Sequence, residues 1–332
     1  MYTGNHPFKK YSEQLNILIN DKKLIVDDPQ FAINSLQHYS YYNLINGYKD
    51  LFLDNSFNYD RFIDGTIFEM LYQVQWIDME MSSLLFRYSL LVEKKIKTRL
   101  SYLIASQFGE LESEYLKSSN FSTSRNNRGK LNTVIKAIDK NRRIDVSAIH
   151  YMDQENNLPP WIATKAISFG DAFTWYSLLK IEDKLNIIDN FCLPIENLTN
   201  NERMMIFNKL VGQVYKYRNL SAHGNRSFKL KIDNEYELPF NTLVKMKVSD
   251  YFENQSRKSL YSVIFCMFIM IDDPYAIENF YRDISYLFSK YLKQEYKFID
   301  KDIYDLFDFP KNFLLILEEL IKSKKYRDTF YN

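Results

Sequence analysis

The feature that most constrains the fold is one long helical pattern, which runs from about Thr66 to Phe108. Apolar side chains recur in it at intervals of three and four residues, as they do along one face of an α-helix. The pattern predicts a single long helix or two nearly continuous ones. The chain has only 8 Gly and 8 Pro in 332 residues, too few for a fold of many short strands and tight turns. We therefore expect an all-α or mostly α protein.

Other segments divide the chain into three parts. Residues 1–65 combine helical spacing with an aromatic cluster, and residues 66–228 form a helical core that contains a basic loop at 117–143. Residues 229–332 are mostly helical, and we assign them no role. In the stretch 228–248, apolar and polar residues tend to alternate one by one, as in a β-strand, more than they recur at helical intervals. This pattern predicts a small β-hairpin.

Composition excludes several classes of protein. The formal net charge is +1, so any contact with nucleic acid has to come from a local basic patch. Two cysteines, Cys192 and Cys266, cannot build a disulfide framework or a thiolate zinc site. The N-terminus lacks the apolar stretch of a signal peptide, and the most apolar run, 261–271, is about half as long as a membrane span. We expect a buried helix at 261–271 and a cytoplasmic protein without a membrane partner.

Familiar catalytic and cofactor motifs are missing from the sequence. It has no P-loop, no G-x-G-x-x-G, no H-E-x-x-H and no nucleophile elbow. The four histidines, His6, His38, His150 and His223, are too dispersed to predict a metal site. We therefore expect no metal ion and no cofactor.

Two groups of cations are candidates for binding phosphate. The first is a basic stretch that contains only one acid, Asp139. Its members are Arg125, Arg128, Lys130, Lys136, Lys140, Arg142 and Arg143. The second group, Lys95 and Arg99, projects near the centre of the apolar stripe of the long helix and needs partners or a phosphate. The alternatives are a solvated charged face for the first group and stems that snorkel to the helix edge for the second.

The stretch YRNLSAHGNR, residues 217–226, places Arg218 and His223 five residues apart, directly before a helix-stop signal. At a helix C-terminus the exposed carbonyls favour a protonated imidazole, so His223 can exchange a proton with a ribose 2′-hydroxyl or a leaving 5′-oxygen. Arg218 offers a planar, permanently charged fork to phosphate oxygens. The pair can cleave RNA without a metal, because the nucleophile belongs to the substrate. Such pairs also arise by chance, as Arg143 and His150 show.

The geometry of a helix sets a condition on this pair. At 100° per residue, five residues separate Arg218 and His223 by about 140° around the axis, so the two side chains do not point the same way. Either the helix unwinds between Ser221 and His223, or two copies of the chain build the site together.

YRNLSAHGNR resembles the R-x4-6-H motif of HEPN ribonucleases, in which a polar residue, here Asn219, follows the arginine. Three further stretches resemble signatures of the Abi-like abortive-infection family, the AbiD/AbiF group, and they occur in the family's order. They are YSYYNLINGYKDLF at 39–52, VEKKIKTRLSY at 92–102, which matches a Glu-containing helix, and PPWIATKAISFG at 159–170. The resemblance covers residues 9 to about 228. Lys165 departs from it, since many members carry Glu after the Trp.

The resemblance implies an all-helical HEPN-like bundle and a metal-independent endoribonuclease of bacterial antiphage defence by abortive infection. It implies that Arg218 and His223 are catalytic, with Asn219 and Glu93 in supporting places. From the residues alone, Glu93 can also form an ordinary exposed pair with Lys97. HEPN nucleases typically dimerise to build the site, so we expect a homodimer. The AbiF branch is linked to small noncoding RNAs, which makes such an RNA a second expected partner.

The leading hypothesis is a defence ribonuclease that binds RNA along the basic stretch and cleaves it to 2′,3′-cyclic phosphate and 5′-hydroxyl ends; DNA is not an expected partner. A second hypothesis is an RNA-binding protein that sequesters or scaffolds a small noncoding RNA without cleaving it. A third is a helical module for protein interaction.

Overall fold

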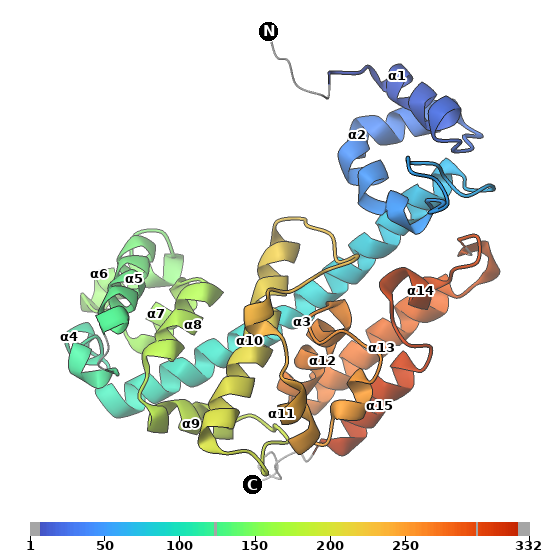
Figure 1. The fold of residues 1–332 in the computed structure, drawn as a ribbon. Helices are drawn as coiled ribbons and strands as arrows, with labels where there is room; N and C mark the ends of the chain where they lie inside the picture. The colour runs from blue at the N-terminus through green and yellow to red at the C-terminus, as the bar shows by residue number, and fades with distance from the viewer. Residues whose placement is uncertain (1–6, 123–124, 297, 325–332) are drawn as a thin grey trace. The chain divides into compact units, whose positions relative to one another are not determined.

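The computed structural model describes residues 7–122, 125–296 and 298–324, and its helices are labelled in Figure 1. Within these residues there are four isolated β-bridges and no β-strand, which confirms the predicted all-α fold. The helices are α1 (Tyr11–Asn16), α2 (Pro29–Tyr48), α3 (Phe68–Phe108), α4 (Glu112–Tyr115), α5 (Arg125–Asn141), α6 (Val146–Glu155), α7 (Pro160–Ala166), α8 (Phe169–Leu178), α9 (Ile181–Asp189), α10 (Asn200–Ala222), α11 (Phe240–Lys245), α12 (Leu260–Met270), α13 (Pro274–Tyr291), α14 (Ile303–Phe307) and α15 (Phe313–Ser323).

The chain folds into two compact units. Unit 1 consists of the residues up to Leu84 together with 224–230 and 283–311. Unit 2 consists of 85–223, 231–282 and the residues from Asn312 onward. The long helix predicted from the sequence is the single 41-residue helix α3, which contributes its first part to unit 1 and the rest to unit 2.

Unit 1 is organised around α2, which begins at an Asp28 N-cap and packs against α1. Ser40 interrupts this helix with a left-handed φ of 62°, so α2 consists of two helical parts joined by a kink. The second part ends in a 3₁₀ turn whose Leu51 carbonyl accepts a hydrogen bond from the Lys301 ammonium. The Phe52 ring next to it packs against Phe298. The end of α2 therefore lies in a core that residues far along the chain help to build.

Unit 2 is organised around α10, which packs against α9 and α12. Every residue of α12, the predicted buried helix, is buried. The apolar character of α12 thus reflects its place in the core. In the part of the chain that the structure describes, no helix combines the length and the apolar character needed to cross a membrane.

Two residues of α10, Gly212 and Gln213, make the contacts that hold it in the middle of unit 2. Gly212 leaves room for the Tyr236 ring, which a Cβ atom at this position would overlap. The Gln213 amide donates to the backbone carbonyls of Tyr236 and Arg257, at 3.0 and 2.7 Å. Its carbonyl oxygen accepts a hydrogen bond from the Ser262 hydroxyl, at 2.7 Å. A polar residue is thereby fully satisfied at the centre of an apolar core.

We expect Gly212→Ala to lower the free energy of unfolding by about 1–3 kcal/mol, because the new methyl group forces the Tyr236 ring out of its site. Gly129→Ala in α5 is the matched control, since a Cβ there meets nothing within 4 Å. That variant is expected to be neutral or more stable by up to about 1 kcal/mol, because Ala favours helix. Urea unfolding of both variants measures the difference, and equal effects would contradict the packing described for α10.

Two predictions of local structure are wrong. The basic stretch 117–143 is not a loop, because residues from Arg125 to Asn141 form helix α5. Leu131, Val134 and Ile138 are buried on one side of α5, which packs against α8, and this burial outweighs the turn preference of the Ser and Asn residues.

The stretch 228–248 is not a β-hairpin. It contains a 3₁₀ turn at Asn234–Tyr236 and helix α11, and its only bridge in the described structure joins Lys231 to Ser259 outside the stretch. Phe228, Leu230 and Ile232 are buried, but the chain turns between them: Lys229 has a left-handed φ of 52°, and the Leu230 amide donates to the Ser227 carbonyl at 3.1 Å. Pro239 then caps α11.

Candidate active site

The Arg218 and His223 motif lies at the C-terminal end of α10, as its stop signals predicted. The helix continues through Ala222, and the His223 amide donates to the carbonyls of Asn219 and Leu220 at 3.2 and 3.3 Å. Gly224 then takes a left-handed φ of 68° and ends the helix. Ser221 and Ala222 stay helical and only His223, the C-cap with φ −93° and ψ 11°, leaves the helix, so ideal helix geometry still separates the Arg218 and His223 side chains by about 140°.

Glu93 on α3 holds the Arg218 side chain in place. The Arg218 Nε donates to Glu93 Oε2 at 2.8 Å, while an Nη donates to the Asn219 side-chain oxygen at 3.2 Å. The Glu93 side chain is 9% exposed and that of Arg218 is 26% exposed. A buried carboxylate thus fixes a guanidinium that still reaches solvent.

Lys97 binds the same carboxylate and was not among the predicted site residues. Its ammonium lies 2.9 Å from Glu93 Oε1 and donates to the Ile167 carbonyl at 2.7 Å. The expected pair of Glu93 with Lys97 is present, but it is buried, whereas the sequence suggested an exposed one. Two cations on one carboxylate leave an excess positive charge beside Arg218, which favours a phosphate.

The PPWIATKAISFG signature packs against α10 next to this cluster. Its Ser168 caps α8 through a reciprocal pair of hydrogen bonds with Asp171. Gly170 lies so close to Tyr215 that a Cβ would come within 2.9 Å of the phenol oxygen, and the Phe169 ring meets Tyr215 edge to face at 5.6 Å. Since Ile167 accepts the Lys97 hydrogen bond, three of the four sequence signatures meet in unit 2.

The fourth signature, YSYYNLINGYKDLF, helps to hold residues 226–228, which follow His223 in the chain. The residues that make these contacts all belong to unit 1. The Tyr48 hydroxyl donates to Asp78 Oδ2 at 2.9 Å, and Asp78 Oδ1 accepts the backbone amides of Ser227 and Phe228 at 3.1 and 2.8 Å. The Arg226 guanidinium donates to the Gly47 carbonyl. This signature therefore acts as an anchor for residues 226–228.

Burial raises the pKa of the Asp78 carboxyl to about 6, although its three hydrogen bonds and the Arg226 guanidinium favour the charged form. The folded protein then holds this proton more tightly than the unfolded chain, whose Asp ionises near pH 4. We expect the free energy of unfolding to fall by up to about 3 kcal/mol from this group as pH rises from about 4 to above 6.

Urea unfolding of the wild type and Asp78→Asn across this range checks the expectation, because Asn keeps the amide contacts and cannot ionise. The wild-type curve should decline with pH relative to that of the variant. Parallel curves would show that Asp78 does not titrate in this way.

His223 is exposed at the end of α10. Its imidazole makes no hydrogen bond or ion pair with any residue that the structure describes, so the ring is free to meet a substrate. Ser221, inside the motif, has a buried hydroxyl oxygen without a hydrogen-bond partner among the described residues. No pattern in the sequence predicted that the Ser221 hydroxyl is buried.

The basic stretch has mixed surroundings. Arg128, Lys130, Lys136, Lys140 and Arg143 are exposed, as a surface that binds phosphate requires. The side chain of Arg125 lies outside the described residues.

Arg142 differs from these cations because it is held by acids of its own unit. It forms a two-pronged pair with Glu112 at 2.6 and 3.1 Å and a further contact with Asp139 at 3.1 Å. Its charge is therefore balanced within the protein.

Lys95 and Arg99 line one cavity but differ in their partners. Lys95 forms an ion pair with Asp272 and lies 3.9 Å from the centre of the Phe191 ring, so its partner is a carboxylate of the protein itself. Arg99 is half-buried and has no hydrogen bond or ion pair with the described residues. It lines a cavity of about 510 Å³ together with Lys94 and Lys95.

Comparison with known proteins gives one family. The model of the family described as Abi-like protein matches residues 34–229, a range that contains all four signatures. No curated protein and no solved structure matches the chain. The matched range covers more than half of the 332 residues. The chain therefore belongs to the family of Abi-like proteins.

Proposed function

We propose that this Abi-like protein is a HEPN-type endoribonuclease that acts in antiphage defence by abortive infection. The observation that carries the proposal is the helix end itself, where buried Glu93 fixes Arg218 on the helix that carries an exposed His223. The family description supports the defence role, and the chemistry of the residues supports the nuclease.

In the proposed mechanism His223 accepts the proton of a ribose 2′-hydroxyl, which attacks the adjacent phosphorus. The bond to the 5′-oxygen breaks, and the leaving oxygen takes the proton that His223 has accepted, so that the products carry a 2′,3′-cyclic phosphate and a 5′-hydroxyl and the imidazole returns to its neutral form. Arg218 stabilises the charge that develops on the phosphate oxygens. Glu93 and Lys97 keep its guanidinium oriented and do not react.

We further propose that two copies of the chain build each site. Arg218 lies on α10 and His223 follows its last residue, about 140° away by ideal helix geometry, so one copy does not direct both side chains at the same phosphate. A twofold dimer solves this problem, because each site takes Arg218 from one copy and His223 from the other. The exposed cations of α5, such as Lys136 and Lys140, would hold the rest of the RNA.

The proposal is tested by incubating the purified protein with total RNA in the presence of EDTA and identifying the product ends by mass spectrometry. We expect cleavage with 2′,3′-cyclic phosphate and 5′-hydroxyl ends. No cleavage, or 3′-hydroxyl and 5′-phosphate ends, would contradict the proposal.

The second candidate is an RNA-binding protein without nuclease activity. It is supported by the ion pair of Arg218 with Glu93, because that contact is also what a purely structural arginine would make. This candidate would be favoured if a discrete, intact RNA co-purified with the protein and the protein cleaved none of the RNAs offered to it. The co-purifying RNA would then be the expected small noncoding RNA partner.

A further inference from the structure

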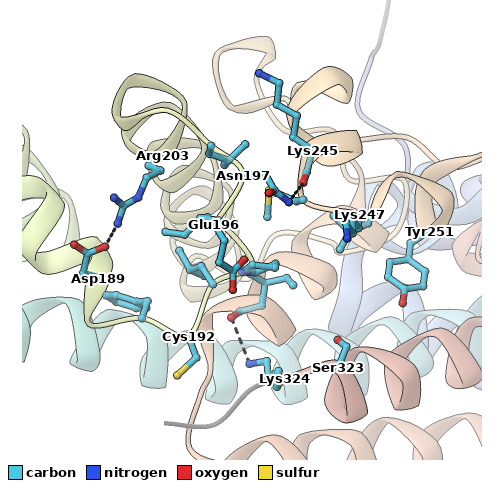
Figure 2. Close-up of a pocket in the computed structure, with 18 residues that line it drawn as sticks. Asp189, Cys192, Glu196, Asn197, Arg203, Lys245, Lys247, Tyr251, Ser323 and Lys324 are labelled. Atoms are coloured by element: carbon cyan, nitrogen blue, oxygen red, sulfur yellow. Dashed lines mark hydrogen bonds and ion pairs between the residues drawn. The ribbon is translucent and has the colours of Figure 1, made fainter.

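A pocket of about 760 Å³ lies at the N-terminal end of α10, and all of its residues belong to unit 2. We call it the α9–α10 pocket, after the loop at 190–199 that forms one wall. Figure 2 shows Arg203 and Asp189 on one side of the pocket, Lys247 and Tyr251 on the other, and Lys324 at its base. Pockets that hold small molecules typically have about 300–1,000 Å³, so this one has room for a ligand of nucleotide size.

The charges of the pocket are only partly balanced by the protein. Arg203 forms an ion pair with Asp189, and Lys245 pairs with Glu202. This leaves three charged groups whose side chains form no ion pair with the described residues, namely Lys247, Lys324 and Glu196. When Lys324 is protonated, two cations and one acid line the cavity, which favours a ligand of net negative charge.

Lys324 is the most unusual of these groups. Its ammonium donates to the carbonyls of Ile269 and Ile271 at the end of α12, and Figure 2 shows it below the Glu196 carboxylate. Burial lowers the pKa of Lys324 to about 7, with the charge of Asp272 opposing this effect. A phosphate in the pocket would stabilise the protonated form of Lys324, and the resulting ammonium would in turn attract the phosphate.

One further observation supports a ligand with hydrogen-bond acceptors. The Nε of Arg203 is buried and has no hydrogen-bond partner among the described residues, although the terminal nitrogen of the same guanidinium binds Asp189. An acceptor with several oxygens in the pocket would give this Nε a partner. Lys247 lies in the pocket wall directly after α11, where its left-handed φ of 59° ends the helix and the amides of Lys247 and Val248 donate to the carbonyls of Val244 and Leu243, both at 3.0 Å.

We propose that the α9–α10 pocket binds a small organic phosphate of nucleotide size. Its phosphate would lie near Lys247 and Lys324, its hydroxyl or amino groups would donate to Glu196, and its ring would lie against Tyr251 and the apolar wall. The proposal concerns binding alone and does not depend on the nuclease activity proposed above.

The test is isothermal titration calorimetry of the full chain with AMP, GMP, CMP and UMP, each in a separate titration. Glucose 6-phosphate and inorganic phosphate are the comparison probes. Glucose 6-phosphate carries a phosphate on a sugar without an aromatic ring, and inorganic phosphate carries no organic group. We expect at least one nucleoside monophosphate to bind more tightly than inorganic phosphate. Binding of glucose 6-phosphate instead would assign the pocket to a sugar phosphate, which is also an organic phosphate.

Lys247→Glu is the decisive variant, because Lys247 is exposed and its replacement leaves the core intact. It should weaken binding at least about tenfold, since it replaces one charge-assisted contact by a repulsion. Lys117→Glu, an exposed lysine without an ion partner in the described structure, is the charge-matched control and should bind as the wild type does.

Three results would overturn the proposal. The first is no heat of binding with any organic phosphate, and the second is tighter binding of inorganic phosphate than of all of them. The third is nucleotide binding that survives in Lys247→Glu but is lost in Arg218→Ala, since this would place the nucleotide at the candidate active site. Failure of the nuclease test leaves these readouts unchanged, so the two proposals fail separately.

Discussion

His223→Ala is expected to cleave RNA about 10²–10⁴-fold more slowly than the wild type, because the variant has no group that can move a proton at the end of α10. Arg218→Ala should lose activity to a similar extent, since the charge on the phosphate oxygens is then unopposed. Arg218→Lys should recover little, because an ammonium does not reproduce the fork that binds both Glu93 and a phosphate.

The measurement is the initial rate of cleavage of a labelled RNA in EDTA. His150→Ala is the matched control, because His150 is an exposed histidine that belongs to the chance pair with Arg143. It should cleave RNA as fast as the wild type. Full activity in His223→Ala would show that this histidine does not take part in the reaction.

Glu93→Gln is expected to lower the free energy of unfolding by about 3 kcal/mol or more, because it leaves two cations around a buried site without a counter-charge. RNA cleavage should fall as well, since the amide no longer fixes the Arg218 guanidinium. Glu93→Gln combined with Lys97→Met removes one of the two cations and should recover part of the lost stability while cleavage stays low. Recovery of stability without activity separates the positioning of Arg218 from a general effect on folding.

The chain offers a matched control for this pair. Glu318 and Lys322 form an ion pair with the same four-residue spacing on α15, but their side chains are 39% and 71% exposed. Glu318→Gln should change the free energy of unfolding by less than about 1 kcal/mol, because solvent screens an exposed pair. If urea unfolding gives equal losses for Glu93→Gln and Glu318→Gln, the burial of Glu93 has no energetic role.

Much of the architecture follows from local patterns. The spacing of apolar residues predicted α3, the wholly apolar run predicted buried α12, and Gly224 and Asn225 marked the end of α10. Each of these features depends on residues that are neighbours along the chain. This is the information that a single sequence carries most directly.

The features that were missed depend on distant parts of the chain. Helix α5 forms where turn-prone residues predicted a loop, because its apolar face is buried against α8. Glu93 is buried because α10 covers it 125 residues later, so its pairing with Arg218 has no local signal. The anchor of Ser227 and Phe228 on Asp78 joins residues that are 149 and 150 positions apart.

The most direct test of the account mixes two inactive variants. If each site takes Arg218 from one copy and His223 from the other, a mixed dimer of Arg218→Ala and His223→Ala contains one intact site. Equal amounts that exchange subunits freely should then recover about a quarter of the wild-type rate, because half of the dimers are mixed and each has one of its two sites intact. A mixture that stays as inactive as its components would contradict a shared site at the end of α10.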